Sequence, residues 1–151
     1  TRALRDRWRD ARVLGVDHAP AMLAAARARQ GWFRRFDRVC ADAAHLPLRE
    51  GSVDLVWSSL MLPWAADPDA VLREVRRVLA PRGYFTFSTL GPDTLRELRE
   101  AWRAVDDGVH VHRFLEMHDL GDALVRAGFA DPVMDVERVT LTYADLGGLV
   151  A

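Results

Sequence analysis

The chain has 151 residues, of which 50% are hydrophobic and 28% charged, and its formal net charge is −1. This length allows one domain with a core, and the balanced charge gives no indication of a nucleic-acid or membrane surface. No apolar run reaches transmembrane length, no signal-peptide pattern is present, and the single cysteine, Cys40, cannot form an internal disulfide. We therefore expect a cytoplasmic protein in which Cys40 is a small buried residue.

The first part of the chain alternates short apolar runs with helical patterns. Val13, Leu14 and Val16 form a run rich in β-branched residues, which is typical of a buried parallel strand. Pro20 follows soon after and suits the first turn of a helix, where its missing N–H needs no partner. The elements predicted here are helices over 1–10 and 20–29, a loop over 31–37, and strands over 13–16, 39–41 and 53–59.

The second part continues the alternation. Asp67 is placed to cap a helix with one apolar face, and Asp93 or Thr94 is placed to cap the next. Gly128 closes a later helix. The elements predicted here are an apolar loop over 60–66, helices over 68–79, 94–105 and 116–127, a turn over 80–83, strands over 84–89, 132–136 and 139–143, and the start of a helix over 146–151.

Alternating strands and helices predict an α/β fold with a parallel sheet and right-handed crossovers. Asp17 and Asp42 each follow a strand at its carboxyl end, the edge where nucleotide-like ligands bind in open α/β sheets. A carboxylate there can accept hydrogen bonds from both hydroxyls of a ribose, and a second can accept from an adenine amino group. The alternative for Asp42 is a turn residue that caps its loop.

Other chemistry finds little support in the residues. No serine or cysteine stands in an elbow or triad arrangement, and no glycine-rich phosphate loop is present. His110, His112 and His118 lack the surrounding ligands of a zinc site, so no metal is expected. The sequence offers no candidate catalytic side chain.

Four stretches together resemble the class I S-adenosylmethionine-dependent methyltransferases. They are Val13–Leu23, Ala41–Ala43, Asp54–Ser59 and Leu72–Tyr84, of which the last is the most specific. Ser88–Leu95 resembles one subgroup, the malonyl-acyl-carrier-protein O-methyltransferases of biotin synthesis (BioC). Further matches to that subgroup are Glu97, Leu98, Ala101, Trp102, His110, Arg113, Phe114 and Met117–Leu120.

The resemblance implies a Rossmann-like sheet and the cofactor S-adenosyl-L-methionine. It assigns the ribose hydroxyls to Asp17 and the adenine amino group to Asp42. The other cofactor-binding positions it implies are His18 and Met22 beside the adenosine, Ala43 against the base through its backbone, and Ser58, Ser59 and Leu60 beside the methionine portion.

A carboxyl methyl acceptor needs no general base, because its pKa of about 4 leaves it ionised at neutral pH. It needs a positioned cation instead, and Arg113 with His110 is the candidate pair. The alternative is that Arg113 is a surface residue tied to a nearby acid. The implied partner, acyl-carrier protein, is acidic. A docking patch for it could be formed by Arg27, Arg29, Arg34 and Arg35. The alternative is that these arginines are only solvated around a helix end.

The family's first strand, its glycine-rich loop and its last strand have no counterpart in residues 1–151. We therefore expect one partial methyltransferase domain whose absent strand lies between those ending at Asp17 and Ser59, and which binds the cofactor poorly alone. Two other functions remain open. They are a small-molecule methyltransferase of quinone or secondary metabolism, and a methyltransferase-like assembly factor of respiratory complex I.

Overall fold

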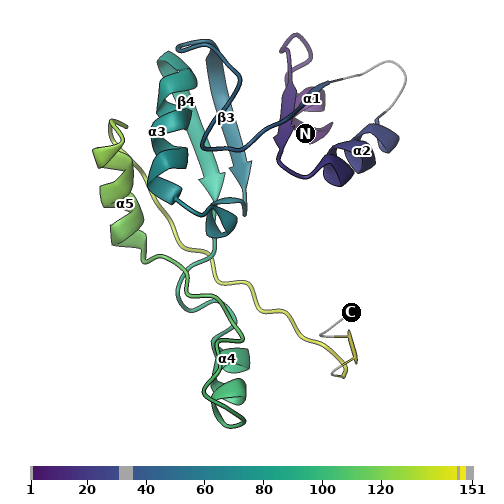
Figure 1. Ribbon diagram of the computed structural model, residues 1–151, viewed down its shortest axis with the longest axis vertical. Helices are drawn as coiled ribbons and strands as arrows, with labels where there is room; N and C mark the ends of the chain where they lie inside the picture. Colours follow the sequence, from purple (N-terminus) through teal and green to yellow (C-terminus); the bar gives the residue numbers. More distant parts are fainter. Residues whose placement is uncertain (1, 31–35, 146, 149–151) are drawn as a thin grey trace.

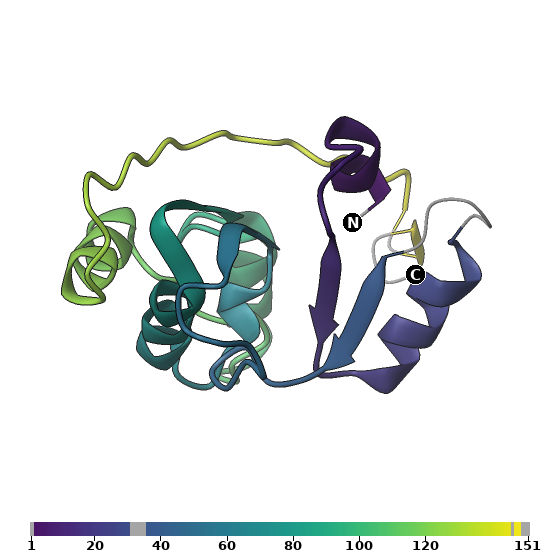
Figure 2. The same ribbon diagram turned by 90° about the horizontal axis from the view of Figure 1, so that it is seen from above.

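The computed structural model describes residues 2–30, 36–145 and 147–148. The chain forms two parallel two-stranded sheets joined by the loop over residues 41–52 (Figures 1 and 2). The first sheet pairs β1 (Leu14–Asp17) with β2 (Asp37–Cys40), and the second pairs β3 (Val53–Ser59) with β4 (Leu79–Ser88). The parallel α/β arrangement predicted from the alternation is confirmed.

The first sheet is built by one strand–helix–strand unit. α1 (Arg2–Arg7) precedes β1, and α2 (Pro20–Ala28) crosses back to β2. Gly15 of β1 lies close to the ring of Phe36, and a Cβ there would lie a tight 3.3 Å from that ring. The loop predicted over 31–37 lies largely outside the described residues. Cys40 is exposed, so the prediction that it is buried is wrong.

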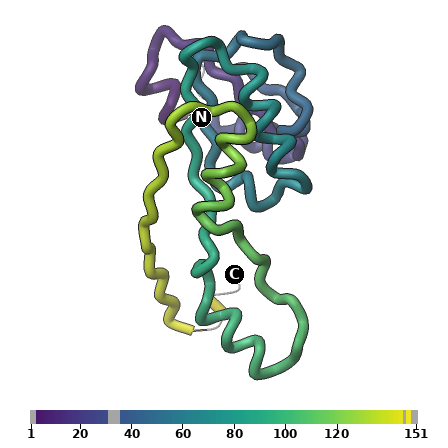
Figure 3. Tube along the Cα trace, turned by 90° about the vertical axis from the view of Figure 1, so that its left-hand side faces the viewer, coloured from purple at the N-terminus to yellow at the C-terminus, as the bar shows by residue number. Residues whose placement is uncertain are grey.

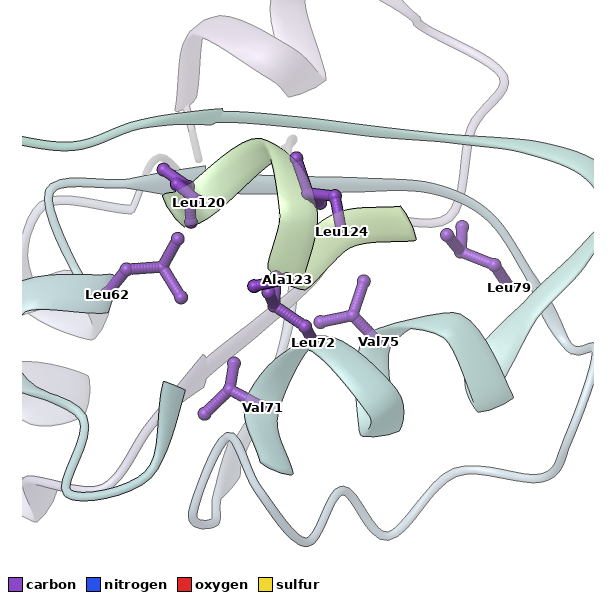
Figure 4. Packing of buried hydrophobic residues seen from close by; sticks show 8 residues of the cluster. All are labelled: Leu62, Val71, Leu72, Val75, Leu79, Leu120, Ala123 and Leu124. Carbon is purple, nitrogen blue, oxygen red and sulfur yellow. The ribbon is translucent and has the colours of Figure 1, made fainter. Parts of the chain in front are cut away.

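The core lies over the second sheet. A 3₁₀ turn, η1 (Leu62–Trp64), falls within the predicted loop 60–66, and α3 (Pro68–Val78) crosses from β3 to β4. Asp67 caps α3 as predicted, since its Oδ1 accepts a hydrogen bond of 2.9 Å from the backbone N–H of Ala70. The buried apolar cluster, shown in Figure 4, comprises Leu62, Val71, Leu72, Val75, Leu79, Leu120, Ala123 and Leu124.

α5 (Met117–Arg126) supplies the outer layer of this core and packs against α3 (Figure 4). It ends at Gly128, as predicted, because the positive φ of 88° there is easily adopted only by glycine. Arg76 of α3 donates from Nε to the carbonyl of Gly128 at 3.0 Å, and Arg126 of α5 lies 3.2 Å from Asp69. These polar contacts flank the apolar interface of the two helices.

The turn predicted over residues 80–83 is absorbed into β4 as a bulge. Val53 is opposite Leu79 but Leu55 is opposite Tyr84, so the register shifts within this stretch. Arg82 accommodates the extra length with a positive φ of 66°.

α4 (Arg96–Arg103) stands away from the second sheet, as Figures 1 and 3 show. The predicted caps are wrong: Leu95 precedes the helix with φ 55°, and no side chain caps it. Asp93 instead pairs with Arg138 at 3.0 Å. That contact ties the start of α4 to the segment beyond α5.

Residues 132–143 run beside the molecule as extended chain (Figure 3), not as the two predicted strands. The alternating pattern is present in the sequence, but these residues pair with none of the described strands. Val133 is 93% exposed and Leu141 is 68% exposed. Of the helix predicted over 146–151, only two residues are described. No helix in the described part of the chain is long and apolar enough to cross a membrane.

Candidate functional site

Asp17 and Asp42 lie beside each other at the carboxyl end of the first sheet. Asp17 is the last residue of β1 and is paired in register with Cys40, the last residue of β2. The backbone N–H of Ala41 donates to the carbonyl of Asp17 at 3.2 Å, so the chain leaves β2 directly toward Asp42. The two carboxylates therefore share one edge of the sheet, as their positions after neighbouring strands predict.

Both carboxylates have the same local geometry. Asp17 Oδ1 accepts from the N–H of Ala19 at 2.9 Å, and Asp42 Oδ1 accepts from the N–H of Ala44 at 2.9 Å. Each bond closes a turn of the kind that aspartate favours. Among the described residues, Oδ2 of Asp17 makes no hydrogen bond, and Oδ2 of Asp42 lies 3.8 Å from His45 Nδ1. Oδ1 of each carboxylate is thus used to orient the side chain, while Oδ2 accepts no hydrogen bond from the described residues.

The other predicted adenosine contacts surround these acids. His18 Nδ1 lies 3.9 Å from Asp17 Oδ1, and its side chain is largely exposed. Met22 is 59% exposed in the first turn of α2. Ala43 is half-buried and packs against the core cluster.

Ser58, Ser59 and Leu60 lie at the carboxyl end of the second sheet. Ser58 is 9% exposed, and its Oγ is a buried polar atom without a hydrogen-bond partner among the described residues. Ser88 Oγ donates to Ser59 Oγ at 3.4 Å, and the N–H of Leu60 donates to the carbonyl of Ser88 at 2.9 Å. Leu60 has a positive φ of 51°, where the chain turns sharply out of β3. No described contact joins these residues directly to Asp17 or Asp42.

His110 and Arg113 line one cavity of about 330 Å³ beside the end of α4. The His110 ring stacks on Trp102, with centroids 4.0 Å apart, and its Nε2 lies 2.7 Å from Asp106 Oδ1. The hydrogen bond from His110 lowers the pKa of Asp106 below its ordinary value, and the N–H of Gly108 acts in the same direction. His110 is therefore held in place by its neighbours.

Arg113 has no ion pair with any acid in the described part of the chain. Arg113 is exposed, and the choice between a substrate-binding arginine and a surface arginine tied to a nearby acid stays a prediction. Arg27 and Arg29, from the predicted docking patch, lie at the end of α2, while Arg34 and Arg35 fall outside the described residues. Within the part of the chain that the structure describes, no group of three His, Cys, Asp or Glu side chains could hold a metal.

Two structural links near the site do not follow from sequence reasoning. Trp64 of η1 meets His112 edge to face, with ring centroids 5.8 Å apart, and so connects the end of β3 to the loop that carries Arg113. Glu74 and Arg77 of α3 bind the loop that follows Asp42. The spacing of Glu74 and Arg77 on one helix face signals an ion pair, but their loop partners lie about thirty positions away in the sequence.

Relatives of known name match nearly the whole of this chain. A malonyl-[acyl-carrier protein] O-methyltransferase of Laribacter hongkongensis is 56% identical over 151 residues, covering 95% of this chain and 51% of that protein. The protein of the same name from Halorhodospira halophila is 53% identical over 144 residues, covering 95% and 49%. The chain thus spans about half the length of these curated relatives.

Solved structures agree with the fold. An S-adenosylmethionine-dependent methyltransferase from Mesorhizobium loti has a TM-score of 0.62 and 31% identity, covering 80% of this chain and 64% of that one. A chain from the complex of the Haloferax volcanii Trm112 methyltransferase activator with a methyltransferase has a TM-score of 0.68 and 31% identity, covering 84% and 54%. The predicted class I, Rossmann-like fold is confirmed.

The model of the methyltransferase domain family matches residues 1–87, which contain both carboxylates and the end of β3. This match covers more than half of the 151 residues. The chain therefore belongs to the methyltransferase domain family, as its sequence motifs predict.

Proposed function

We propose that the protein uses S-adenosyl-L-methionine to methylate the free carboxyl group of a malonyl thioester on acyl-carrier protein, in biotin synthesis. The observation that carries this proposal is the 56% identity over 95% of the chain to a malonyl-[acyl-carrier protein] O-methyltransferase. The geometry supports it with two carboxylates at one sheet edge and with Arg113, which has no ion pair with an acid among the described residues. A cytoplasmic location stays a prediction.

The residues present fit the proposed cofactor. Asp17 and Asp42 each have one carboxylate oxygen that could bind a ribose or a base. The buried Oγ of Ser58 has no hydrogen-bond partner among the described residues, and a bound ligand could supply one. Asp17 would hold the ribose hydroxyls, Asp42 the base, and Ser58, Ser59 and Leu60 the methionine portion. When bound, the cofactor supplies a methyl group on a positively charged sulfur.

The remaining task of the chain is alignment. An ionised carboxylate is already a nucleophile, so the protein has to orient it and exclude water rather than remove a proton. Arg113 can grip such a carboxylate with two hydrogen bonds, and His110, fixed by Trp102 and Asp106, forms the adjacent wall of the cavity. No catalytic side chain is required.

Methyl transfer tests this function directly. With labelled S-adenosylmethionine, we expect label to pass to malonyl-acyl-carrier protein and not to acetyl-acyl-carrier protein, which lacks only the carboxyl group. Transfer to a small quinone-like phenol but not to the malonyl thioester would contradict the proposal and favour the small-molecule alternative. Failure with both, together with capture of a respiratory subunit, would favour an assembly factor.

Arg113→Ala should raise the KM for malonyl-acyl-carrier protein by about tenfold or more, because a charge-assisted pair is worth about 1.5–3 kcal/mol. The affinity for S-adenosylhomocysteine should stay unchanged. Steady-state kinetics and calorimetric titration measure the two quantities. Arg96→Ala is the control, because Arg96 is exposed and its ion pair with Glu97 is long, at 3.8 Å. An unchanged KM for Arg113→Ala would remove this residue from the substrate site.

A further inference from the structure

The loop that carries Asp42 is held by two charged residues of α3. Arg77 donates from Nη1 to the carbonyl of Leu48 at 2.9 Å and from Nη2 to the carbonyl of Leu46 at 3.1 Å. Glu74 Oε1 accepts from the N–H of Leu46 at 2.7 Å. One helix thus satisfies both backbone groups of Leu46 and the carbonyl of Leu48.

Glu74 and Arg77 also bind each other, which fixes both side chains for this task. Arg77 Nε lies 2.7 Å from Glu74 Oε2, and Arg77 Nη2 lies 2.7 Å from Glu74 Oε1. The Glu74 side chain is only 14% exposed, while that of Arg77 is 37% exposed, so the pair is bidentate and its carboxylate is largely shielded from solvent. The hydrogen bond from Arg77 lowers the pKa of Glu74 below its ordinary value, which keeps this carboxylate ionised.

The backbone of α3 holds the far end of the same loop. The N–H groups of Gly51 and Ser52 donate to the carbonyls of Arg77 and Val78 at 3.0 and 2.9 Å. These are carbonyls of the last helical turn, which have no partner within the helix. The loop after Asp42 is therefore attached to α3 by side chains near its middle and by backbone at its end.

A short turn connects this attachment to the carboxylate of Asp42. The N–H of His45 donates to the carbonyl of Asp42 at 3.0 Å, and the N–H of Ala44 donates to its Oδ1 at 2.9 Å. Leu46, the next residue, is the one held by Glu74 and Arg77. Because only this one turn separates the two residues, a displacement of Leu46 would also displace Oδ2 of Asp42.

We propose that Arg77 and Glu74 are positioning residues that hold the turn over Asp42–His45, and that they thereby determine the preference for a purine base carrying a 6-amino group. This inference rests on the proposed function, because it takes Asp42 as the acceptor for that group. Neither residue touches the ligand. Their effect is on selectivity between bases. If the Asp42 carboxylate were not held in place, a base with a 6-amino group would gain little binding free energy from it, and a base with an oxygen there would lose little.

The test compares two ligands on the same protein sample. S-adenosylhomocysteine carries the 6-amino group, and S-inosylhomocysteine carries an oxygen there. We expect the wild type to bind the first about tenfold or more tightly, the size of one charge-assisted hydrogen bond. In Arg77→Met and in Glu74→Gln, this ratio should fall to within about threefold. Calorimetric titration gives both constants.

Arg73→Met is the matched control, because it removes the same positive charge from α3. The ion pair of Arg73 with the exposed Asp67 is long, at 3.8 Å. Its ratio should match the wild type. The ratio does not depend on the folded fraction of a sample, so partial unfolding of a variant leaves the result readable.

The outcomes separate the two proposals. If the wild type binds and discriminates but Arg77→Met and Glu74→Gln keep the same ratio, even at lower affinity for both ligands, the positioning role is wrong and the pair only stabilises the fold. The measurements are made on the protein with the family's first strand and glycine-rich loop in place. If that protein binds neither ligand, the proposed function fails, and the inference that rests on it fails too.

Discussion

Asp17→Ala is expected to weaken the binding of S-adenosylhomocysteine by about a hundredfold or more. The carboxylate is held by the N–H of Ala19 with one oxygen left over, an arrangement that can accept from the hydroxyls of a ribose. Each hydrogen bond to a charged acceptor is worth about 1.5–3 kcal/mol, and about 1.4 kcal/mol changes a dissociation constant tenfold. Calorimetric titration measures the loss.

Asp37→Ala is the control for this prediction. Asp37 lies at the amino end of β2, the opposite edge of the same sheet from Asp17, and its exposed pair with Arg12 at 2.9 Å contributes little. Its variant should bind as the wild type does. Asp17→Asn keeps an acceptor for Ala19 and should lose less than Asp17→Ala. Equal affinity in all three variants would show that Asp17 does not contact the ligand.

Leu72→Ala is expected to lower the free energy of unfolding by about 2–5 kcal/mol, the range for a leucine deleted from a packed core. Leu72 is 0% exposed at the centre of the cluster that joins α3 to α5 and the second sheet. A loss of this size is a large fraction of the 5–15 kcal/mol, roughly, that stabilises a domain. Urea denaturation followed by circular dichroism measures it.

Leu141→Ala makes the same chemical change at a side chain that is 68% exposed in the extended segment. Its effect should stay within about 0.5 kcal/mol. If the two variants unfolded at the same urea concentration, the cluster around Leu72 would not be the core of the protein.

Elements whose signals are local could be predicted from the sequence. The strand over 53–59 has the predicted bounds, because its apolar residues, Val53, Leu55, Val56 and Trp57, form one short run that can be recognised locally. α3 begins after Asp67 and α5 ends before Gly128, since a cap and a positive φ depend on one residue each. The positions of Asp17 and Asp42 at one sheet edge follow from parallel pairing alone.

Predictions that needed a distant partner were wrong. The alternating residues 132–143 are extended but unpaired, because a strand exists only where another strand offers its N–H and C=O groups. Asp93 has the right residue type for a helix cap, yet its carboxylate binds Arg138. Cys40 lies in an apolar run but is exposed at the sheet edge.

The sequence by itself determined the order of strands and helices as far as α5, the methyltransferase family and the two acids of the proposed cofactor site. Periodicity, capping and motif spacing depend on neighbouring residues, so they can be read along the chain. Only the tertiary structure decided that Glu74 and Arg77 hold the loop after Asp42, and that Trp64 meets His112. These contacts join segments far apart in sequence, and packing of the whole chain, not any local pattern, brings them together.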